Sequence, residues 1–410
     1  MGYTSKAIQG FSWHSFFKFS ATALVVIKLV VLARILKPAD FGIFSLVAIA
    51  LGMTESVTQT GINLIILQSK KSIEYFLNTA WVIAIIRGLS IAIIMNVLAF
   101  LMSRYYQQRE LLTLISLASF VPFIKGFINP SIIRMQKEMS FLADSFYRIS
   151  LILVEVIVAI LLGLIFKSVY VLVISMIGAA IFEVAISFAF FKDKPMFIFS
   201  KNRAVEIFES SRWLNLSAFF SYLHENLDNL LIGKFTNITS LGFYQNAYAL
   251  SHKPNFDLSQ SVAHSVLPVF AQISGSPKRL KKAFSRSTLV SMSIFLLLSL
   301  PLLIYPQITI IILGDNWFNS IPLVRPLVLA GIIQAFSNLC YNLFYIQKKY
   351  KIVNYHLGFS TLLMAILIVF LTPKYGIVGA AWAVFISRAL PLLMIISFFI
   401  KDNFRIKSHG

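Results

Sequence analysis

The sequence predicts an all-α polytopic membrane protein with about twelve transmembrane helices. Apolar residues make up 58% of the 410-residue chain, and its mean hydropathy is +0.80. Apolar segments of roughly 20 residues recur along the chain, and a helix of that length spans the ~30 Å hydrocarbon core of a bilayer. A soluble chain of this size needs a more polar surface, so this composition excludes an ordinary globular protein.

The apolar segments define the expected helices in chain order, separated by short clusters of charge. The first is expected to be retained rather than cleaved as a signal peptide, because Lys18 and Lys28 interrupt it and no clear small-residue cleavage site is present. The expected spans are 11–33, 41–67, 77–101, 110–133, 146–166, 169–191, 211–235, 240–272, 284–313, 321–346, 352–371 and 375–400.

Lysine and arginine concentrate on every second connection between these spans. With the N-terminal tail placed in the cytoplasm, the even-numbered connections and both tails hold 19 basic residues, and the odd-numbered connections hold 7. The positive-inside rule then predicts cytoplasmic termini and an even number of crossings. Because the net charge of +20 lies largely in these clusters, it is expected to set topology and contact anionic lipid, not nucleic acid.

The longest extramembrane stretch, about 192–210, lies midway and divides the chain into predicted lobes 1–200 and 201–410. An offset of 200 residues brings Trp13 onto Trp213 and Gly42 onto Gly242. Six spans per lobe would give both lobes the same orientation, as parallel repeats around a central cavity. The alternative is a single twelve-helix bundle with fortuitous matches.

Charged residues inside the apolar segments are the candidates for function. Each costs roughly 2.5–3.5 kcal/mol at mid-bilayer, so it needs a partner or an aqueous cavity. On the first helix, His14, Lys18 and Lys28 fall within one sector of about 80° at about 100° per residue. Arg87 and Glu55 add charge at a similar depth. Snorkelling to the interface is the alternative for Lys18.

Other buried charges leave their roles open. For Arg388, the sequence favours neither a position in the cavity nor a structural role. Glu155 and Glu183 stand alone in the fifth and sixth spans. Each is either a proton-coupling carboxylate or the partner of a neighbouring lysine or arginine, and the sequence does not decide between the two.

The seventh and eighth spans are the most polar. A segment with so many polar groups lines an aqueous space or kinks, or else its polar groups bond neighbouring helices. The candidate substrate-binding residues are therefore His14, Lys18, Lys28, Arg87, His224, Asn226, His252 and Lys253. The candidate ion-coupling residues, for H⁺ or Na⁺, are Glu55, Asp228 and Asp257.

The sequence lacks the motifs of cofactor-dependent chemistry. We find no Walker A pattern, no zinc-type histidine spacing and no dinucleotide-binding loop. We therefore expect no cofactor, no metal and no enzymatic activity. The single Cys340 excludes an internal disulfide. A cavity rich in Lys, Arg and His favours an anionic passenger, because cation-to-phosphate hydrogen bonds are strong.

The motifs also resemble a known family. LARILKPADFGIFSLVAIALG and the downstream TQTGI (58–62) resemble the N-terminal signature of Wzx-type polysaccharide flippases of the multidrug/oligosaccharidyl-lipid/polysaccharide exporter superfamily. DNLLIGK (228–234), LGFYQNAYAL (241–250) and LPVF (267–270) resemble the motif that opens the second half.

The resemblance implies a fold of two six-helix lobes, and it implies a transported substrate, here called the passenger. That passenger would be an undecaprenyl-diphosphate-linked oligosaccharide, the repeat unit of an O-antigen or exopolysaccharide. It would be moved from the inner to the outer leaflet of the bacterial cytoplasmic membrane by alternating access. Lys18 and Lys28 fit the basic residues that hold the diphosphate, and polymerase and glycosyltransferase machinery are candidate partners. The alternatives are an ion-coupled drug exporter and, less favoured because the outer connections are short, an integral-membrane sugar polymerase.

Overall fold

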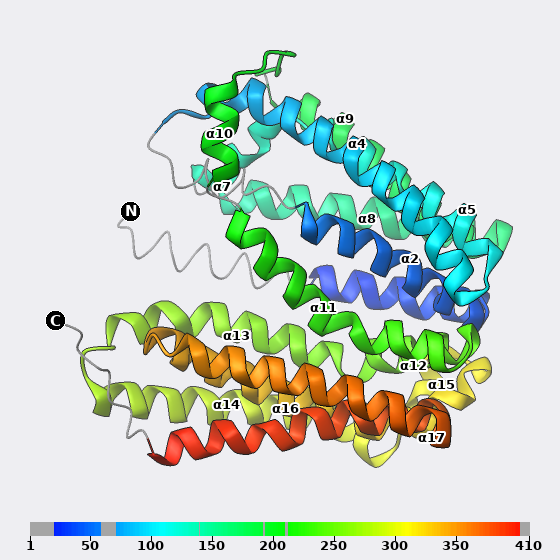
Figure 1. Cartoon of the computed structure of the whole chain (residues 1–410), viewed down its shortest axis with the longest axis vertical. Coiled ribbons are helices and arrows are strands. Elements are labelled where there is room, and N and C mark those ends of the chain that lie inside the picture. Colours follow the sequence, from blue (N-terminus) through cyan, green and yellow to red (C-terminus); the bar gives the residue numbers. More distant parts are fainter. Residues whose placement is uncertain (1–19, 59–70, 139, 192, 210–211, 402–410) are drawn as a thin grey trace. The chain divides into compact units, whose positions relative to one another are not determined.

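The computed structural model describes residues 20–58, 71–138, 140–191, 193–209 and 212–401, and these are helical nearly throughout, with no strand among them (Figure 1). The predicted all-α class is confirmed. The chain separates into two compact units, unit 1 (Met1–Asn226) and unit 2 (Leu227–Gly410). The predicted boundary between the two lobes was 200/201, whereas the two units divide after Asn226. That the two units are repeats of one another stays a prediction.

Unit 1 begins, in the described residues, with a helix over 20–35. The next helix starts at Pro38, where a proline costs no helical hydrogen bond, and the Asp40 carboxylate accepts from the Lys37 backbone N–H (2.8 Å). The remaining elements are α2 (Pro38–Val57), α4 (Ile73–Tyr106), α5 (Arg109–Ala118), α6 (Phe120–Lys125), η1 (Pro130–Ile132), α7 (Ile133–Lys137), α8 (Phe141–Phe166), α9 (Tyr170–Phe190), α10 (Lys201–Glu209) and α11 (Arg212–Phe235), which continues into unit 2.

Unit 2 is built around one buried helix, α16, which packs against four α-helices and one 3₁₀ helix of the unit. Its elements are α12 (Ile238–Ser251), α13 (Lys253–Gln272), α14 (Pro277–Ile304), α15 (Ile308–Leu313), η2 (Asp315–Ser320), α16 (Ile321–Ile346) and α17 (Tyr350–Lys401). Gly331 lets α16 approach α12 and α13 closely, because a Cβ there would lie 3.0 Å from the His252 Cα.

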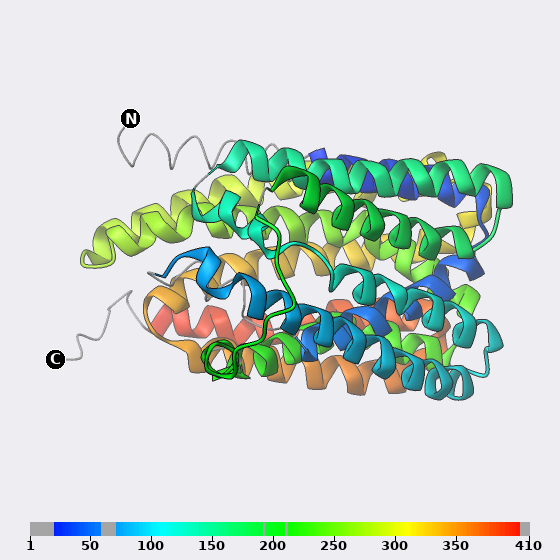
Figure 2. The same ribbon diagram turned by 90° about the horizontal axis from the view of Figure 1, so that it is seen from above.

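The 52-residue α17 is a helical hairpin rather than one rod. Gly376 has φ 61° and ψ −149°, a backbone conformation that only glycine adopts readily. The Ser360 hydroxyl donates to the Ser387 carbonyl (2.7 Å), whereas 27 residues of straight helix would separate them by roughly 40 Å. The two halves of α17 therefore lie side by side, as Figure 2 also shows, and they correspond to the two predicted spans 352–371 and 375–400.

The described residues contain seven helices long and apolar enough to cross a membrane, with the hairpin α17 counted once. An eighth is present if the pair 109–125 and 130–137, bent by 68°, forms one span. The count of about twelve is therefore not confirmed. Two predicted spans differ from the structure: the span 110–133 is bent, and the span 240–272 is divided at His252 into α12 and α13. Pro254 lacks an N–H and cannot continue the helix from α12.

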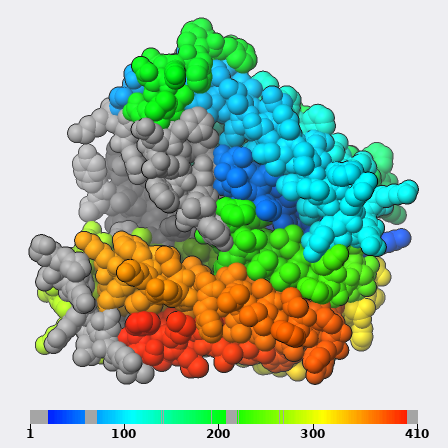
Figure 3. Space-filling model, viewed as in Figure 1, coloured from blue at the N-terminus to red at the C-terminus, as the bar shows by residue number. Residues whose placement is uncertain are grey.

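A short amphipathic helix, α10, packs on α4 outside the candidate spans. Its Ala204 and Ile207 join a buried apolar cluster with Phe76. Lys71 donates to the Glu206 carboxylate (2.9 Å), and this hydrogen bond raises the pKa of Lys71. The segment before α10, at the top of Figure 3, exposes the four apolar side chains Met196, Phe197, Ile198 and Phe199.

Candidate functional site

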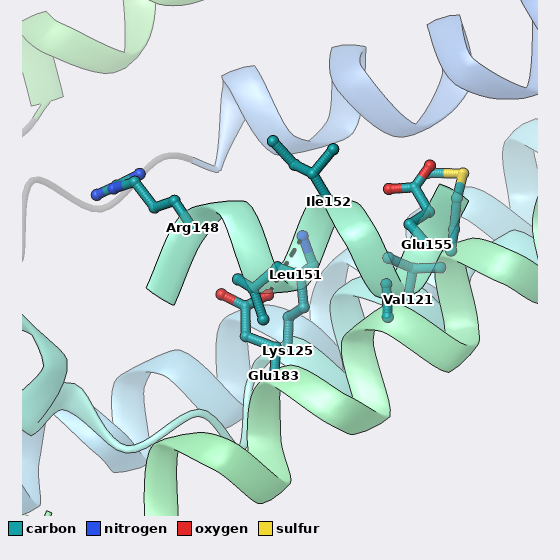
Figure 4. A pocket seen from close by; sticks show the side chains of 9 residues that line it. Val121, Lys125, Arg148, Leu151, Ile152, Glu155 and Glu183 are labelled. Carbon is teal, nitrogen blue, oxygen red and sulfur yellow. Dashed lines mark ion pairs between the residues drawn. The ribbon is translucent and has the colours of Figure 1, made fainter. Parts of the chain in front are cut away.

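A pocket of about 310 Å³ lies within unit 1, between α6, α8 and α9 (Figure 4). Four of its lining side chains are charged, which is unusual for residues drawn from such apolar helices. The lining residues are Val121 and Lys125 of α6, Arg148, Leu151, Ile152 and Glu155 of α8, and Met176, Ala179 and Glu183 of α9.

The pocket opens on the side of these helices that faces away from lipid. At about 100° per residue, the pocket-lining positions of α8 lie roughly 180° from the exposed apolar stripe of the same helix, which comprises Leu142, Phe146, Leu153, Ile157, Leu161 and Leu164. On α9 the exposed Ile174 and Ile181 likewise oppose Glu183. Acyl chains cover an apolar stripe, so the charged face looks onto the interior of the unit or onto water.

Each carboxylate that lines the pocket meets a lysine from another element. Lys28, on the helix 20–35, places its Nζ 2.5 Å from Glu155 Oε1, and the two side chains are 18% and 28% exposed. Lys125 Nζ lies 3.7 Å from Glu183 Oε2. The sequence left open whether each glutamate couples protons or pairs with a neighbouring lysine or arginine. In the structure each of the two glutamates pairs with a lysine.

A third ion pair completes the charge balance. The Nε of Arg148 donates to Asp144 Oδ2 (3.0 Å), one turn earlier on α8. These three pairs leave the surroundings of the pocket with equal numbers of cations and carboxylates. Opposite charges that neutralise one another lower the cost of keeping ionised groups inside the membrane.

Arg87 and Glu55, two of the predicted site residues, are neighbours beside this site. The Arg87 guanidinium donates to the Glu55 carbonyl (3.4 Å) and to the Thr58 hydroxyl (3.5 Å), so it joins α4 to the end of α2. The Glu55 carboxylate interacts electrostatically with both Arg87 and Glu183. Arg87 is not among the residues that line the pocket.

The other predicted residues of the first 226 positions are less informative. His14 and Lys18 lie outside the described residues. His224 and Asn226 lie on α11 and are partly exposed. The side-chain amide of Asn226 donates to the Tyr222 carbonyl one turn earlier (2.9 Å), a bond within its own helix.

Unit 2 contains a separate buried polar cluster around Asp228. The Tyr244 hydroxyl donates to Asp228 Oδ2 (2.6 Å), and the Asn229 backbone N–H donates to Oδ1 (2.8 Å). Arg388 interacts electrostatically with Asp228 and contacts the ring of His252. The predicted ion-coupling residue Asp228 is thus enclosed by donors from its own unit.

Of the two predicted neighbours His252 and Lys253, the first is buried and the second is exposed. The His252 ring is buried and stacks on Tyr248 at 4.3 Å between ring centroids, whereas Lys253 is exposed. Asp257, on the next turn of α13, is partly exposed. Within the described part of the chain, no group of three His, Cys, Asp or Glu side chains comes together as metal ligands.

Sequence reasoning did not select Lys125 and Arg148 as site residues. One signal was present: each lies inside a predicted span, 110–133 or 146–166. Arg148 also falls on the side of its helix opposite the apolar stripe. Matching opposite charges in neighbouring spans would have added both residues to the candidates.

Comparison with known proteins identifies the family. The model of the polysaccharide biosynthesis protein family matches residues 31–322. The chain belongs to that family. The chain is 21% identical over 356 residues to the lipopolysaccharide biosynthesis protein WzxC of Escherichia coli K12, covering 82% of this chain and 69% of WzxC. The predicted family resemblance is confirmed.

Solved structures show which fold the chain shares. The lipid II flippase MurJ, in an inward closed conformation, superposes with a TM-score of 0.73 at 14% identity, covering 95% of this chain and 88% of MurJ. An inward-facing MATE family multidrug resistance transporter of the MOP superfamily superposes with a TM-score of 0.67 at 13% identity, covering 95% of this chain and 96% of that transporter. With its long apolar helices, the chain is a multi-pass membrane protein.

Proposed function

We propose that this protein is a flippase for a polyprenyl-diphosphate-linked oligosaccharide. It would move the O-antigen or exopolysaccharide repeat unit from the inner to the outer leaflet of the bacterial cytoplasmic membrane, with both termini in the cytoplasm. The observation that carries the proposal is the family match over residues 31–322. The transporter fold and the cationic groups in a pocket turned away from lipid support it.

The mechanism follows from the chemistry of such a passenger. The diphosphate is the anionic part, and Lys28 and Arg87, with His14 and Lys18, are the cations proposed to offset its charge. The polyprenyl tail stays in lipid while the sugars cross through polar surroundings, where His224, Asn226, His252 and Lys253 are the proposed hydrogen-bonding partners. Glu55, Asp228 and Asp257 are proposed to couple the cycle to H⁺ or Na⁺.

The first test is genetic. A strain that lacks the chromosomal gene is complemented with wild-type protein, with the Lys18→Ala/Lys28→Ala variant, or with Lys374→Ala as a control at an exposed position. At matched protein levels, we expect the double variant to lower surface polysaccharide and the control to leave it unchanged. Undiminished polysaccharide in the double variant would remove these lysines from the mechanism.

A second test distinguishes the proposed function from its rivals. Purified protein in liposomes is given a fluorescent polyprenyl-diphosphate saccharide, and its transfer between leaflets is measured by the fraction protected from an impermeant quencher. Protein-dependent transfer is expected. Because the fold is also that of a multidrug transporter, drug sensitivity with intact surface polysaccharide in the deletion strain would favour a drug exporter. Sugar transfer by the purified chain would favour a polymerase.

A further inference from the structure

Two carboxylates and one lysine line the pocket in unit 1, a second lysine pairs with one of these carboxylates, and each of the four residues comes from a different element. Glu155 lies on α8, Glu183 on α9 and Lys125 on α6, and all three line the pocket. Lys28 reaches Glu155 from the helix 20–35. Four separate elements therefore bring these charges together, which requires the packing of the whole unit.

We propose that Glu155 and Glu183 are built-in counter-ions that a phosphate-type anion displaces. In the empty pocket the two carboxylates hold Lys28 and Lys125. When the anion enters, its oxygens accept hydrogen bonds from both ammonium groups in place of the carboxylates. The return of the carboxylates to the lysines then releases the anion. This inference rests on the proposed function in one respect, that the phosphate belongs to the passenger.

The geometry makes the Lys125–Glu183 pair the one that opens first. Its Nζ–Oε2 distance of 3.7 Å is too long for a hydrogen bond, and the Lys125 side chain is 44% exposed although that of Glu183 is only 18% exposed. Without a hydrogen bond, and with its ammonium group half-exposed, this pair is held less tightly than Lys28–Glu155 at 2.5 Å. A diphosphate carries more charge than one carboxylate and offers several acceptor oxygens, so it competes effectively for the same ammonium group.

The Lys28–Glu155 pair is closer and more buried, so it opens second. Figure 4 shows Arg148 at one end of the pocket and Glu155 at the other, with Lys125 and Glu183 between them. An anion that enters beside Lys125 therefore meets Glu155 next. Its approach to that carboxylate is unfavourable unless Glu155 moves away and leaves Lys28 to the anion.

The size of the pocket selects the part of the passenger that it can hold. Its volume of about 310 Å³ lies at the lower end of the range of small-molecule pockets, about 300–1,000 Å³. That volume suits a phosphate or diphosphate group and not an oligosaccharide. The walls contributed by Val121, Leu151, Ile152 and Met176 are apolar and offer nothing to sugar hydroxyls.

The test uses purified full-length protein and inorganic pyrophosphate as the probe, with binding measured by calorimetry. Glu155→Gln and Glu183→Gln remove the competing charge without changing side-chain size. We expect each to bind pyrophosphate about threefold to tenfold more tightly than wild type, the range for loss of one partly exposed ionic competitor. Glu110→Gln is the matched control, because Glu110 is exposed and lies outside the pocket. Lys125→Ala should bind more weakly.

Two further measurements separate the possible outcomes. In the liposome assay, Glu183→Gln should transfer the passenger more slowly despite tighter binding, since release needs the returning carboxylate; a purely structural glutamate would not give this combination. Unchanged or weaker pyrophosphate binding by both glutamine variants, with wild-type elution from size-exclusion chromatography, would overturn the inference. If Glu155→Gln does not fold, Glu183→Gln alone decides.

The source of the phosphate is tested in the same way. Nanodiscs with and without phosphatidylglycerol replace the detergent. If the glutamine variants gain affinity for phosphatidylglycerol but not for pyrophosphate, the pocket belongs to a membrane lipid headgroup and the assignment to the passenger is overturned. If the pyrophosphate pattern holds while wild-type protein transfers no passenger, the anion site stands and the proposed flippase function fails.

Discussion

The Tyr244 hydroxyl offers the clearest single-atom test of the polar cluster in unit 2. It donates to Asp228 at 2.6 Å, and both side chains are almost completely buried, at 0% and 1% exposure. Tyr244→Phe keeps the ring and removes this one donor. A hydrogen bond to a charged group is worth about 1.5–3 kcal/mol. The Asp228 carboxylate would lose this donor but would keep the hydrogen bond from the Asn229 backbone N–H.

The assay is thermal unfolding of the purified protein in one detergent. At roughly 2–4 °C per kcal/mol for a unit of this size, the apparent Tm should fall by roughly 3–12 °C. Tyr305→Phe, which removes an exposed hydroxyl in the same unit, is the control and should not change the Tm. In an Asp228→Asn background Tyr244→Phe should cost less, because the acceptor is no longer charged. Equal Tm values for Tyr244→Phe and Tyr305→Phe would refute this reading of the cluster.

Three further outcomes are expected. Gly376→Ala places a Cβ at φ 61°, ψ −149° and should cost about 1–3 kcal/mol, seen as a lower Tm; an unchanged Tm would mean that the turn relaxes freely. Gly52→Ala places a Cβ against the Tyr222 hydroxyl, closer than van der Waals contact allows, so the Tm should fall and recover when Tyr222→Leu is added. Lys28→Met should lower the free energy of unfolding by about 1–2 kcal/mol after allowance for partial exposure, seen as a lower Tm, and adding Glu155→Leu should restore the Tm but not surface polysaccharide. Restored polysaccharide in that double variant would show that the pair is structural.

The most apolar helices could be predicted well from the sequence. The predicted spans 146–166, 169–191 and 321–346 agree closely with α8, α9 and α16. Local hydropathy suffices there, because a long apolar run in a membrane has no alternative to helix. The predicted division of 352–400 into two spans is also matched, by the reversal of α17 at Gly376.

The polar segments were harder to predict because packing decides them. The run over 240–272 predicted a single span that lines water or kinks, and the structure breaks it at His252, where α16 approaches through Gly331. Pro254 is a local signal for the break, but nothing in the local sequence reveals the approach of α16.

The candidate site shows the same limit more sharply. The sequence revealed charges inside the spans, but not that Lys28 meets Glu155 or that Lys125 meets Glu183. These partners depend on helix rotation and depth, which a single sequence does not specify. Arg87 was selected for its charge alone, and the structure gives it backbone and hydroxyl acceptors at the end of α2.

The pairing of Lys28 with Glu155 also constrains how the protein is made. The two residues are separated by 127 positions, and ribosomes add about 5–20 residues per second, so the lysine emerges roughly 6–25 s before its carboxylate. During that interval the first helix carries an uncompensated charge, which favours residence at the interface or within the insertion machinery over open lipid. The helix that carries Lys28 can therefore pack stably in the membrane only after α8 has been synthesised and has brought Glu155 to it. The assembly of the unit then depends on when each charged partner is made, as well as on the order of the helices.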